Sequence, residues 1–476
     1  MNRIDFLKTL GFGLSSSYLL SGCMGNGDPV PVSEITDFSN ALKIPETVFN
    51  PVSLNAKVVQ DAILGGKTTS CLGYGFGMLG PTIRISKGDK LNLKFTNQLN
   101  KHSNVHWHGL IIPSEMDGHP DQMVMPNESF NYSFFVNQQA GTNWYHPHVH
   151  ELTGEQVTQG LAGLFIVESS EEKALSLPNG IFEIPLIIQD KRFNADGSIK
   201  YKPSMDEVMS GYMGETILVN GTFSPFLNVS ANLYRFRILN GSSARIYNLA
   251  LSNGANFYII GSDGGILEKP EQINSILLAS GERLDVLVDF SKATLNSEIF
   301  LESKTFLGMG DAQGTQDFRI LKFIINKPGV ADFKIPNTLI PVQKTSGPTK
   351  TRSFSLKMNM MSMKGGMHRI NGKVYDSSRI DETVLLGATE IWQFNNSTGD
   401  EPHPMHMHGV HFQVVSRSGG RNSIQPHEKG WKDTVLVAPK EKVEVIVKFT
   451  QKGKFVFHCH NLEHEDDGMM LNFEVK

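Results

Sequence analysis

The chain has 476 residues, a formal net charge of −4 and 19% charged residues. This balance excludes the basic face that nucleic-acid binding needs, so no nucleic-acid partner is expected. At roughly 150 residues per domain, the length predicts about three domains. The 45 glycines and 22 prolines, together with many short β-branched runs, favour an all-β fold.

The first 23 residues predict a signal peptide. Arg3 and Lys8 come before a mostly apolar stretch at 10–20, which is typical of a secretory signal rather than a membrane span. The sequence Leu-Ser-Gly-Cys at 20–23 resembles the lipobox of bacterial lipoproteins, so Cys23 is expected to be lipidated and to anchor the protein to a membrane. We therefore expect the protein in the periplasm or cell envelope. Ile4 stands where a twin-arginine signal has its second arginine, which leaves the export route open.

Two motifs recur along the chain and indicate three similar sandwich units. In the first motif, a short strand and an asparagine precede a histidine pair at 94–109 and again at 392–409, whereas the copy at 237–245 has no histidine. In the second, a histidine pair is followed by an apolar strand, at 143–168 and again at 455–475. The expected divisions are a linker at 24–45, a first unit at 46–170, a middle unit with its linker at 171–345, and a third unit at 346–476.

Local patterns predict several elements within these units. Alternating apolar residues indicate strands at 82–95, 284–290 and 442–449. A helix is expected at 205–213, where three methionines recur every four residues and share one face.

Histidines gather in four His-x-His pairs, two in the first unit and two in the third. On extended chain the members of a pair lie about 6.6 Å apart on one side, so both imidazoles face the same way. The simplest arrangement brings the two units face to face around one metal cluster. Imidazole suits copper, zinc, iron and nickel, so the pairs alone do not choose the metal. The pairs are His106/His108, His146/His148, His406/His408 and His458/His460.

Six histidines fall outside this pattern and are expected to have ordinary polar or core roles. They are His102, His119, His150, His368, His411 and His427.

The fourth pair encloses Cys459, and His464 and Met469 follow it. A thiolate with imidazoles and a weak axial methionine is the ligand set of a blue-copper electron-transfer site. On a strand, Cys459 points away from its two histidine neighbours, so it can serve one metal while they serve another. Cys71 has no evident partner, and we therefore expect no disulfide in the mature protein.

The four paired segments resemble the four signature motifs of multicopper oxidases, and most of all those of bacterial three-domain laccases and copper-efflux (cuprous) oxidases. The resemblance implies three consecutive cupredoxin-like, Greek-key β-sandwich domains and four copper ions. It also implies four one-electron oxidations coupled to the reduction of O2 to water, with copper tolerance as the biological setting. The middle unit then keeps the fold without the metal.

The resemblance also assigns roles to individual residues. His403, Cys459, His464 and Met469 match the type 1 copper ligands, and His106 and His406 match the type 2 ligands. Asp117 and Glu465 match acids that relay protons in similar oxidases. The type 3 pair is matched by His108, His146, His148, His408, His458 and His460.

A methionine-rich stretch at 358–367 indicates which substrate gives up the electrons. It contains Met358, Met360, Met361 and Met363. Thioethers are soft ligands that prefer Cu(I), so this stretch is expected to receive cuprous ions. Asp400 and Glu401 stand where cuprous oxidases can carry an aspartate and a methionine for the incoming ion. Phenols and aryl amines are expected as further reductants.

Two alternatives remain beside a cuprous oxidase, and two further classes of protein are not expected. A general laccase would lack a dedicated cuprous site, and a copper-sequestering envelope lipoprotein would bind Cu(I) without turnover. A two-domain nitrite reductase is not expected to have four His-x-His pairs in three units. A non-enzymatic division or scaffold protein would have lost ligands that this chain keeps.

Overall fold

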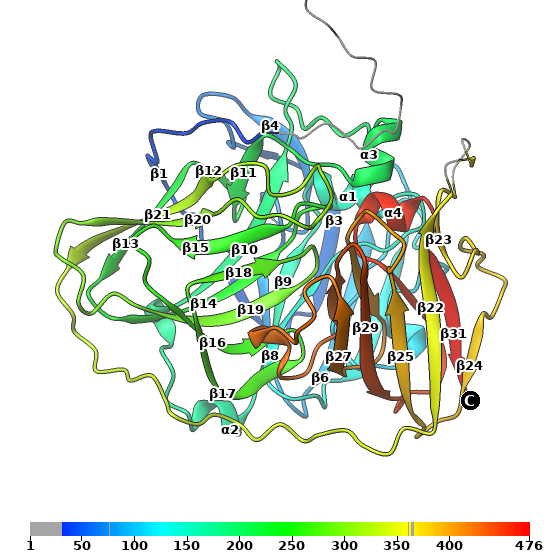
Figure 1. The fold of residues 1–476 in the computed structure, drawn as a ribbon. Coiled ribbons are helices and arrows are strands. Elements are labelled where there is room, and N and C mark those ends of the chain that lie inside the picture. The colour runs from blue at the N-terminus through cyan, green and yellow to red at the C-terminus, as the bar shows by residue number, and fades with distance from the viewer. Residues whose placement is uncertain (1–30, 76, 360, 363–365) are drawn as a thin grey trace, which may run out of the picture.

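The computed structural model describes residues 31–75, 77–359, 361–362 and 366–476. Within these residues the chain is mostly β, with its strands arranged in six sheets (Figure 1). The all-β prediction is confirmed. The signal peptide, Cys23, Met360 and Met363 lie outside the described residues. Among the described residues, no helix is both long and apolar enough to cross a membrane.

Two four-stranded sheets form the first sandwich, with strand orders β4-β3-β6-β7 and β2-β5-β9-β8. Between them lies an apolar core that contains Phe95, Trp107 and Phe165. The strands are β2 (Thr47–Phe49), β3 (Ser53–Asp61), β4 (Thr69–Gly73), β5 (Thr82–Ser86), β6 (Lys90–Asn97), β7 (Ser129–Phe135), β8 (Gly141–Tyr145) and β9 (Gly163–Glu168), with the helices η1 (Ser114–Met116) and α1 (Thr153–Gln159).

The middle sandwich has a six-stranded sheet, β1-β13-β21-β20-β15-β18, and a seven-stranded one, β12-β11-β10-β14-β19-β16-β17. Its strands are β1 (Asn40–Ala41), β10 (Glu183–Lys191), β11 (Thr216–Val219), β12 (Thr222–Phe223), β13 (Pro225–Ser230), β14 (Leu233–Asn240), β15 (Tyr247–Leu251), β16 (Phe257–Ser262), β17 (Gly265–Ile273), β18 (Ser275–Leu278), β19 (Arg283–Asp289), β20 (Glu298–Ser303) and β21 (Phe318–Lys327). Its helices are α2 (Ser170–Lys173), η2 (Gly180–Phe182) and α3 (Met205–Ser210).

The third sandwich consists of two five-stranded sheets, β23-β22-β25-β29-β27 and β24-β31-β30-β26-β28, around a core with Trp392 at its centre. Its strands are β22 (Lys350–Met358), β23 (His368–Ile370), β24 (Glu382–Val384), β25 (Thr389–Asn395), β26 (His403–Met407), β27 (Phe412–Gly419), β28 (Thr434–Val437), β29 (Glu441–Lys448), β30 (Gly453–Cys459) and β31 (Met470–Val475). The helices are η3 (Pro426–Glu428) and α4 (Leu462–Asp466).

Apolar contacts join the three sandwiches. Trp144 and Leu164 of the first unit are buried against Leu239 of the middle one, and burial of one such leucine contributes about 1.5–3 kcal/mol. Ile246 of the middle unit packs with Leu436 of the third. At one end of the molecule α4 contacts both α1 and α3, so one short helix from each unit meets there (Figure 1).

Two local predictions differ from the structure. The stretch 82–95 is two strands in different sheets, because the chain turns at Gly88, whose φ of 94° is a left-handed conformation that suits glycine. The helix expected at 205–213 ends at Ser210, since Gly211 has a φ of 95° and leaves the helical path. A capping box between Ser204 and Glu207 fixes its start.

Candidate metal centre

Three donor atoms converge in the third unit. Cys459, at the end of β30, places its Sγ 3.5 Å from His403 Nδ1 and 3.6 Å from His464 Nδ1. β26 and β30 are hydrogen-bonded neighbours, with Met405 opposite Cys459 and His406 opposite His458. Because side chains alternate along strands, this register sends the thiol to one face and the paired histidines to the other.

The two imidazoles beside Cys459 offer lone pairs to a metal. The Nε2 of His464 donates to the backbone oxygen of Met209 at 2.9 Å, which leaves Nδ1 without a proton. Burial lowers the pKa of His403 to about 3, so its ring is neutral at neutral pH. Burial also raises the pKa of the Cys459 thiol above its usual range. A bound cation would offset this cost of forming the thiolate.

Met469, the predicted axial ligand, lies in the core of the third sandwich, where its side chain is fully buried. Its backbone oxygen accepts from the Cys459 N–H at 3.0 Å, and its N–H donates to the His464 oxygen at 2.8 Å. Hydrogen bonds to the Met469 backbone thus fix the segment between Cys459 and His464.

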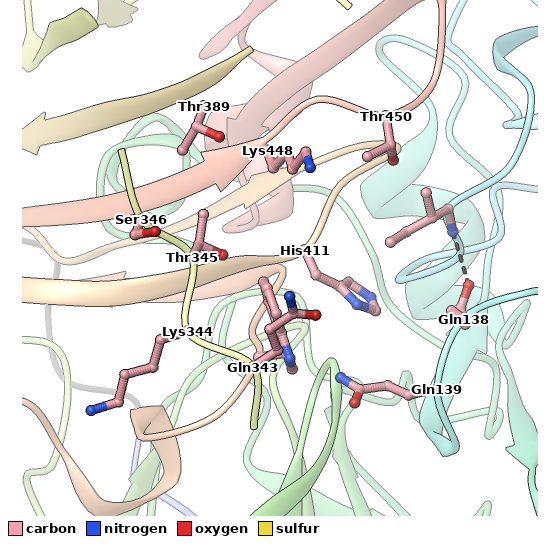
Figure 2. A pocket seen from close by; sticks show the side chains of 12 residues that line it. Gln138, Gln139, Gln343, Lys344, Thr345, Ser346, Thr389, His411, Lys448 and Thr450 are labelled. Atoms are coloured by element: carbon pink, nitrogen blue, oxygen red, sulfur yellow. Dashed lines mark hydrogen bonds between the residues drawn. The ribbon is translucent and has the colours of Figure 1, made fainter. Parts of the chain in front are cut away.

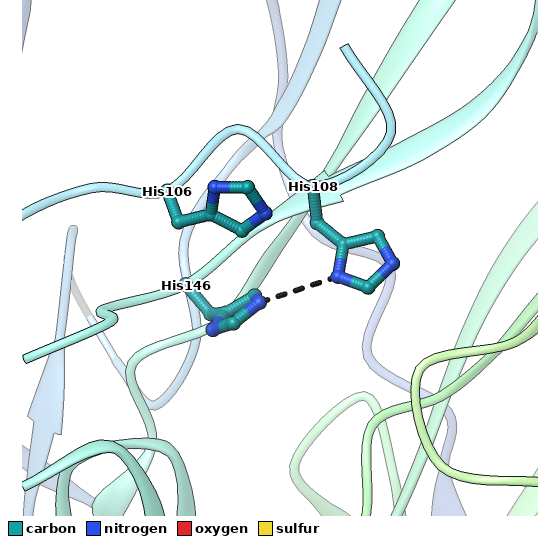
Figure 3. A group of neighbouring side chains, drawn as sticks. All are labelled: His106, His108 and His146. Carbon is teal, nitrogen blue, oxygen red and sulfur yellow. Dashed lines mark hydrogen bonds between the residues drawn. The ribbon is translucent and has the colours of Figure 1, made fainter. Parts of the chain in front are cut away.

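All four histidine pairs meet between the first and third units, as predicted. The backbones of His106 and His146 form an isolated antiparallel bridge, and Figure 3 shows their rings with that of His108. His106 Nε2 lies 3.4 Å from His406 Nε2. His458 Nε2 lies 3.0 Å from His148 Nε2 and 3.2 Å from His408 Nε2.

Hydrogen bonds fix the protonated nitrogen of several of these rings. An oxygen that can only accept forces the imidazole nitrogen facing it to carry the proton. The Nδ1 atoms of His106, His146, His406 and His458 each face a backbone carbonyl, and that of His408 faces a carboxylate oxygen of Asp117.

The inward Nε2 atoms of His106, His406, His408 and His458 are therefore bare acceptors. Burial, and then the neighbouring histidines, lower the pKa of His106 and His408 well below the usual range, which keeps these rings neutral. Facing lone pairs at 3.2–3.4 Å repel unless a cation lies between them. The residues present thus fit a cluster of metal ions.

The two predicted proton-relay acids both lie at this cluster. Asp117 is fully buried; its Oδ2 accepts from His408 Nδ1 at 2.7 Å, whereas its Oδ1 has no hydrogen-bond partner. Glu465 Oε2 lies 3.1 Å from His458 Nδ1. Burial raises the pKa of Asp117 well above its usual range. For Glu465, burial is outweighed by His148 and His458, which bring its pKa to about 2.

A third buried acid, Asp433, was missed by the sequence analysis. Its Oδ1 lies 3.1 Å from His108 Nε2, and its backbone oxygen accepts from His406 Nδ1 at 2.9 Å. Arg283 of the middle unit donates to both of its carboxylate oxygens, at 2.7 Å for Oδ1. Burial alone would raise the pKa of Asp433, but the Arg283 guanidinium holds this pKa well below its usual range. The residues around Asp433 in the chain carry no motif that marks this role.

The predicted reductant-binding residues are spread over two segments. Met358, at the end of β22, is 38% exposed and Met361 is 93% exposed. Asp400 is exposed and pairs with Lys440 at 2.6 Å. Glu401 is buried with an unpartnered Oε2, and burial, aided by Asp311 and Asp400, raises its pKa to about 7.

One of the six histidines set aside from the pattern lies at the mononuclear group. The ring of His368 stacks on that of His464, with centroids 3.6 Å apart and planes at 19°. His368 is a buried residue, in keeping with the expected core role, and it also contacts a ligand candidate, which was not predicted. Sequence spacing could not reveal this, because the two residues meet only through the packing of β23 on α4.

A cavity of about 430 Å³ lies elsewhere, between the first unit, the 343–346 segment and the third unit. Gln138, Gln343, Lys448 and His411 line it (Figure 2). His411 donates from Nε2 to the backbone oxygen of Gly109 at 2.8 Å, next to His108. None of the described residues of the β22–β23 hairpin lines this cavity, so it does not coincide with the predicted reductant-binding stretch.

Comparisons with known proteins agree with this geometry. Three family models described as Multicopper oxidase match residues 55–172, 141–306 and 345–476. A multicopper oxidase of Staphylococcus haemolyticus is 35% identical over 86% of this chain and 84% of its own length. A laccase of Bacillus subtilis is 31% identical over 92% and 98%. The cell division protein FtsP of Escherichia coli is also 31% identical, over 98% and 97%.

Solved structures give the same picture. The McoA multicopper oxidase of Aquifex aeolicus superposes with a TM-score of 0.86 at 37% identity and covers 92% of this chain and all of its own. A multicopper oxidase of Campylobacter jejuni, described as a metallo-oxidase, has a TM-score of 0.80 at 31% identity, with 94% and 96% covered. The predicted cupredoxin-like three-domain fold is thereby confirmed.

Proposed function

Because the chain belongs to the multicopper oxidase family, we propose that it couples the one-electron oxidation of Cu(I) to the reduction of O2 to water. Membership implies a copper-dependent oxidoreductase that uses O2 and a reducing substrate. A broader activity on phenols and aryl amines accompanies the cuprous one in this proposal. The observation that carries it is the convergence of the Cys459 Sγ with the Nδ1 atoms of His403 and His464, together with the stacking of His368, which follows the methionine-rich stretch, on His464.

The donor set supports four copper ions. His403, Cys459, His464 and Met469 would hold one ion, and His106 and His406 a second. A further pair would be held by His108, His146, His148, His408, His458 and His460. Bound there, copper supplies one-electron redox chemistry, and four ions together match the four electrons that O2 requires.

The chain itself supplies the electron path and the protons. Cys459 is covalently continuous with His458 and His460, which gives a short through-bond route from the mononuclear group to the cluster. Asp117 and Glu465 have pKa values moved in opposite directions, which favours the protonated form of Asp117 and the carboxylate form of Glu465. In this proposal Asp117 holds a proton to give from its unpartnered Oδ1, and Glu465, whose Oε2 lies 3.1 Å from His458 Nδ1, is the carboxylate that receives a proton.

Asp117→Asn is expected to slow O2 reduction by about 10²-fold, the usual contribution of a general acid. Asparagine keeps the volume and can still accept from His408, so copper content and visible absorption should stay the same. Stopped-flow reoxidation of the reduced enzyme measures the step. Reoxidation at the wild-type rate would remove Asp117 from the proton path.

The reductant assignment is tested on the methionines. We expect replacement of Met358, Met360, Met361 and Met363 by serine to lower kcat/KM for Cu(I) at least about tenfold, since soft thioether ligands for Cu(I) are lost. Steady-state O2 consumption with Cu(I) provides the measurement. Met123 and Met125 are about half exposed in the first unit, and their double serine variant is the matched control. Unchanged Cu(I) kinetics would favour a general laccase.

A copper-sequestering lipoprotein is the second candidate, favoured by the exposed methionines at the hairpin. O2 consumption by the copper-loaded protein with Cu(I) separates it from an oxidase, because a binder consumes none.

The cuprous-oxidase proposal includes a cellular location. It places the protein in the periplasm or cell envelope, anchored through lipidated Cys23, with a role in copper tolerance. This placement is supported by the sequence at 1–23.

A further inference from the structure

The outward side of His464 is closed to solvent. Its exposed fraction is 0%, its Nε2 donates to the Met209 oxygen of α3 at 2.9 Å, and its ring face is covered by His368. His368 is also fully buried. A reductant in solution therefore cannot touch His464, and electrons reach it through one of the residues that cover it.

The β22–β23 hairpin extends this contact to the surface. The two strands are antiparallel, with Leu356 opposite Ile370 and Met358 opposite His368. Directly opposite residues share one face of a sheet, with Cβ atoms about 4.5–5.5 Å apart. Leu356 is fully buried, and Met358, two residues on along the same face, is 38% exposed. Met358, His368 and His464 thus form a continuous row from solvent to the mononuclear group.

Three hydrogen bonds hold His368 in this row. Its Nε2 donates to the backbone oxygen of Val208 in α3 at 3.1 Å. Its backbone N–H donates to Asp467 Oδ2 at 3.0 Å, and that of Gly366 donates to Asp467 Oδ1 at 2.8 Å. Asp467 directly follows α4, which carries His464. The turn that presents His464 therefore also positions the ring stacked on it.

We propose that His368 is a positioning residue that conducts electrons from a reductant at Met358 into His464. This inference rests on the proposed function and concerns the route rather than the reaction. The reductant loses one electron, so that Cu(I) leaves as Cu(II), and the centre held by Cys459 gains it. No bond forms or breaks in Met358 or His368, and neither is itself oxidised. A small soft cation fits the thioether, whereas a phenol or aryl amine has no direct contact with His464 and would donate its electron through the residues that cover it.

The test compares His368→Ala, which removes the ring, with His368→Phe, which keeps a flat ring and loses only the bond to Val208. Copper-loaded protein is mixed anaerobically with Cu(I) or with hexaammineruthenium(II), and bleaching of the visible absorption is followed. We expect His368→Ala to slow bleaching by both at least fivefold, with an unchanged reduction potential, and His368→Phe to stay within twofold of wild type. Met358→Leu should slow bleaching by Cu(I) but not bleaching by hexaammineruthenium(II).

His102→Ala serves as the control for loss of a histidine away from the site, and thermal unfolding of the copper-free proteins checks folding. Wild-type bleaching rates in His368→Ala would overturn the route. A slowed variant whose reduction potential has moved, or a His368→Phe as slow as His368→Ala, would also overturn it, because disturbance of the centre would then explain the rate. If wild type is bleached by hexaammineruthenium(II) but not by Cu(I), the proposed cuprous function fails while the route is still judged by the ruthenium rates.

Discussion

Cys459→Ser is expected to abolish the intense visible absorption of the copper-loaded protein and to reduce O2 consumption with every reductant to background. The thiolate is the only soft anionic donor among the atoms that converge with His403 and His464. It is also the covalent start of the path to His458 and His460. The loss should exceed the roughly 10- to 100-fold cost of removing a residue that merely supports a ligand.

Cys71→Ser is the matched control for this substitution. Cys71 is the other described cysteine. It is buried, with an exposed fraction of 2%, in the core that joins the first and middle units. Its replacement should leave absorption and turnover as in wild type, even if the copper-free protein unfolds at a lower temperature. Optical and electron paramagnetic resonance spectra, with an oxygen electrode, measure both variants. Blue colour in Cys459→Ser would contradict the assignment of the mononuclear ligands.

Arg283→Leu is expected to destabilise the copper-free protein and to disturb the histidine cluster at the same time. Arg283 is fully buried and donates to Asp433, Thr142 and Gly281, so leucine leaves the Asp433 carboxylate without its counter-charge. Breaking a buried pair in this way costs about 3–5 kcal/mol. For a chain of this size, that corresponds to a fall of roughly 3–5 °C in the unfolding midpoint.

The second effect follows from what Asp433 contacts. Its Oδ1 lies at His108 Nε2, and its backbone orients His406. A displaced Asp433 should therefore change the electron paramagnetic resonance signal of the copper ion that His406 would hold. Arg417→Leu is the matched control, because Arg417 is equally buried and pairs with Glu428 and Glu441 in the third unit. Arg417→Leu should lower the unfolding midpoint by a similar amount and leave the paramagnetic resonance signal unchanged. An unaltered signal in Arg283→Leu would limit Arg283 to a structural role.

The sequence could predict the donors because their geometry is local. Two histidines separated by one residue on extended chain must share a face, and Cys459 between His458 and His460 must take the other. The shared face of each pair and the opposite face of Cys459 both follow from the geometry of an extended chain. Neither depends on how the three units dock. The same holds for the alternation that predicted strands near 284–290 and 442–449, which the structure places at β19 and β29.

Residues that act through long-range packing could not be predicted in this way. Asp433 and Arg283 are 150 positions apart and meet only when the middle and third units dock. His368 reaches His464 only because β23 and α4 lie together in the fold, which no spacing in the sequence encodes. The strand expected at 82–95 was broken by one glycine, because alternation of apolar residues continues across a turn while hydrogen-bonded pairing does not.

His106 and His406, whose Nε2 atoms face each other, are 300 positions apart in the chain. At roughly 5–20 residues per second, a ribosome needs about 15–60 s to make the second histidine after the first. During this interval the first unit has half a cluster and no partner for it. Metal ions that arrive early would find only the incomplete set and could bind it in the wrong geometry. Faithful assembly of the centre therefore favours copper delivery after synthesis is finished, to a chain whose three sandwiches have already docked.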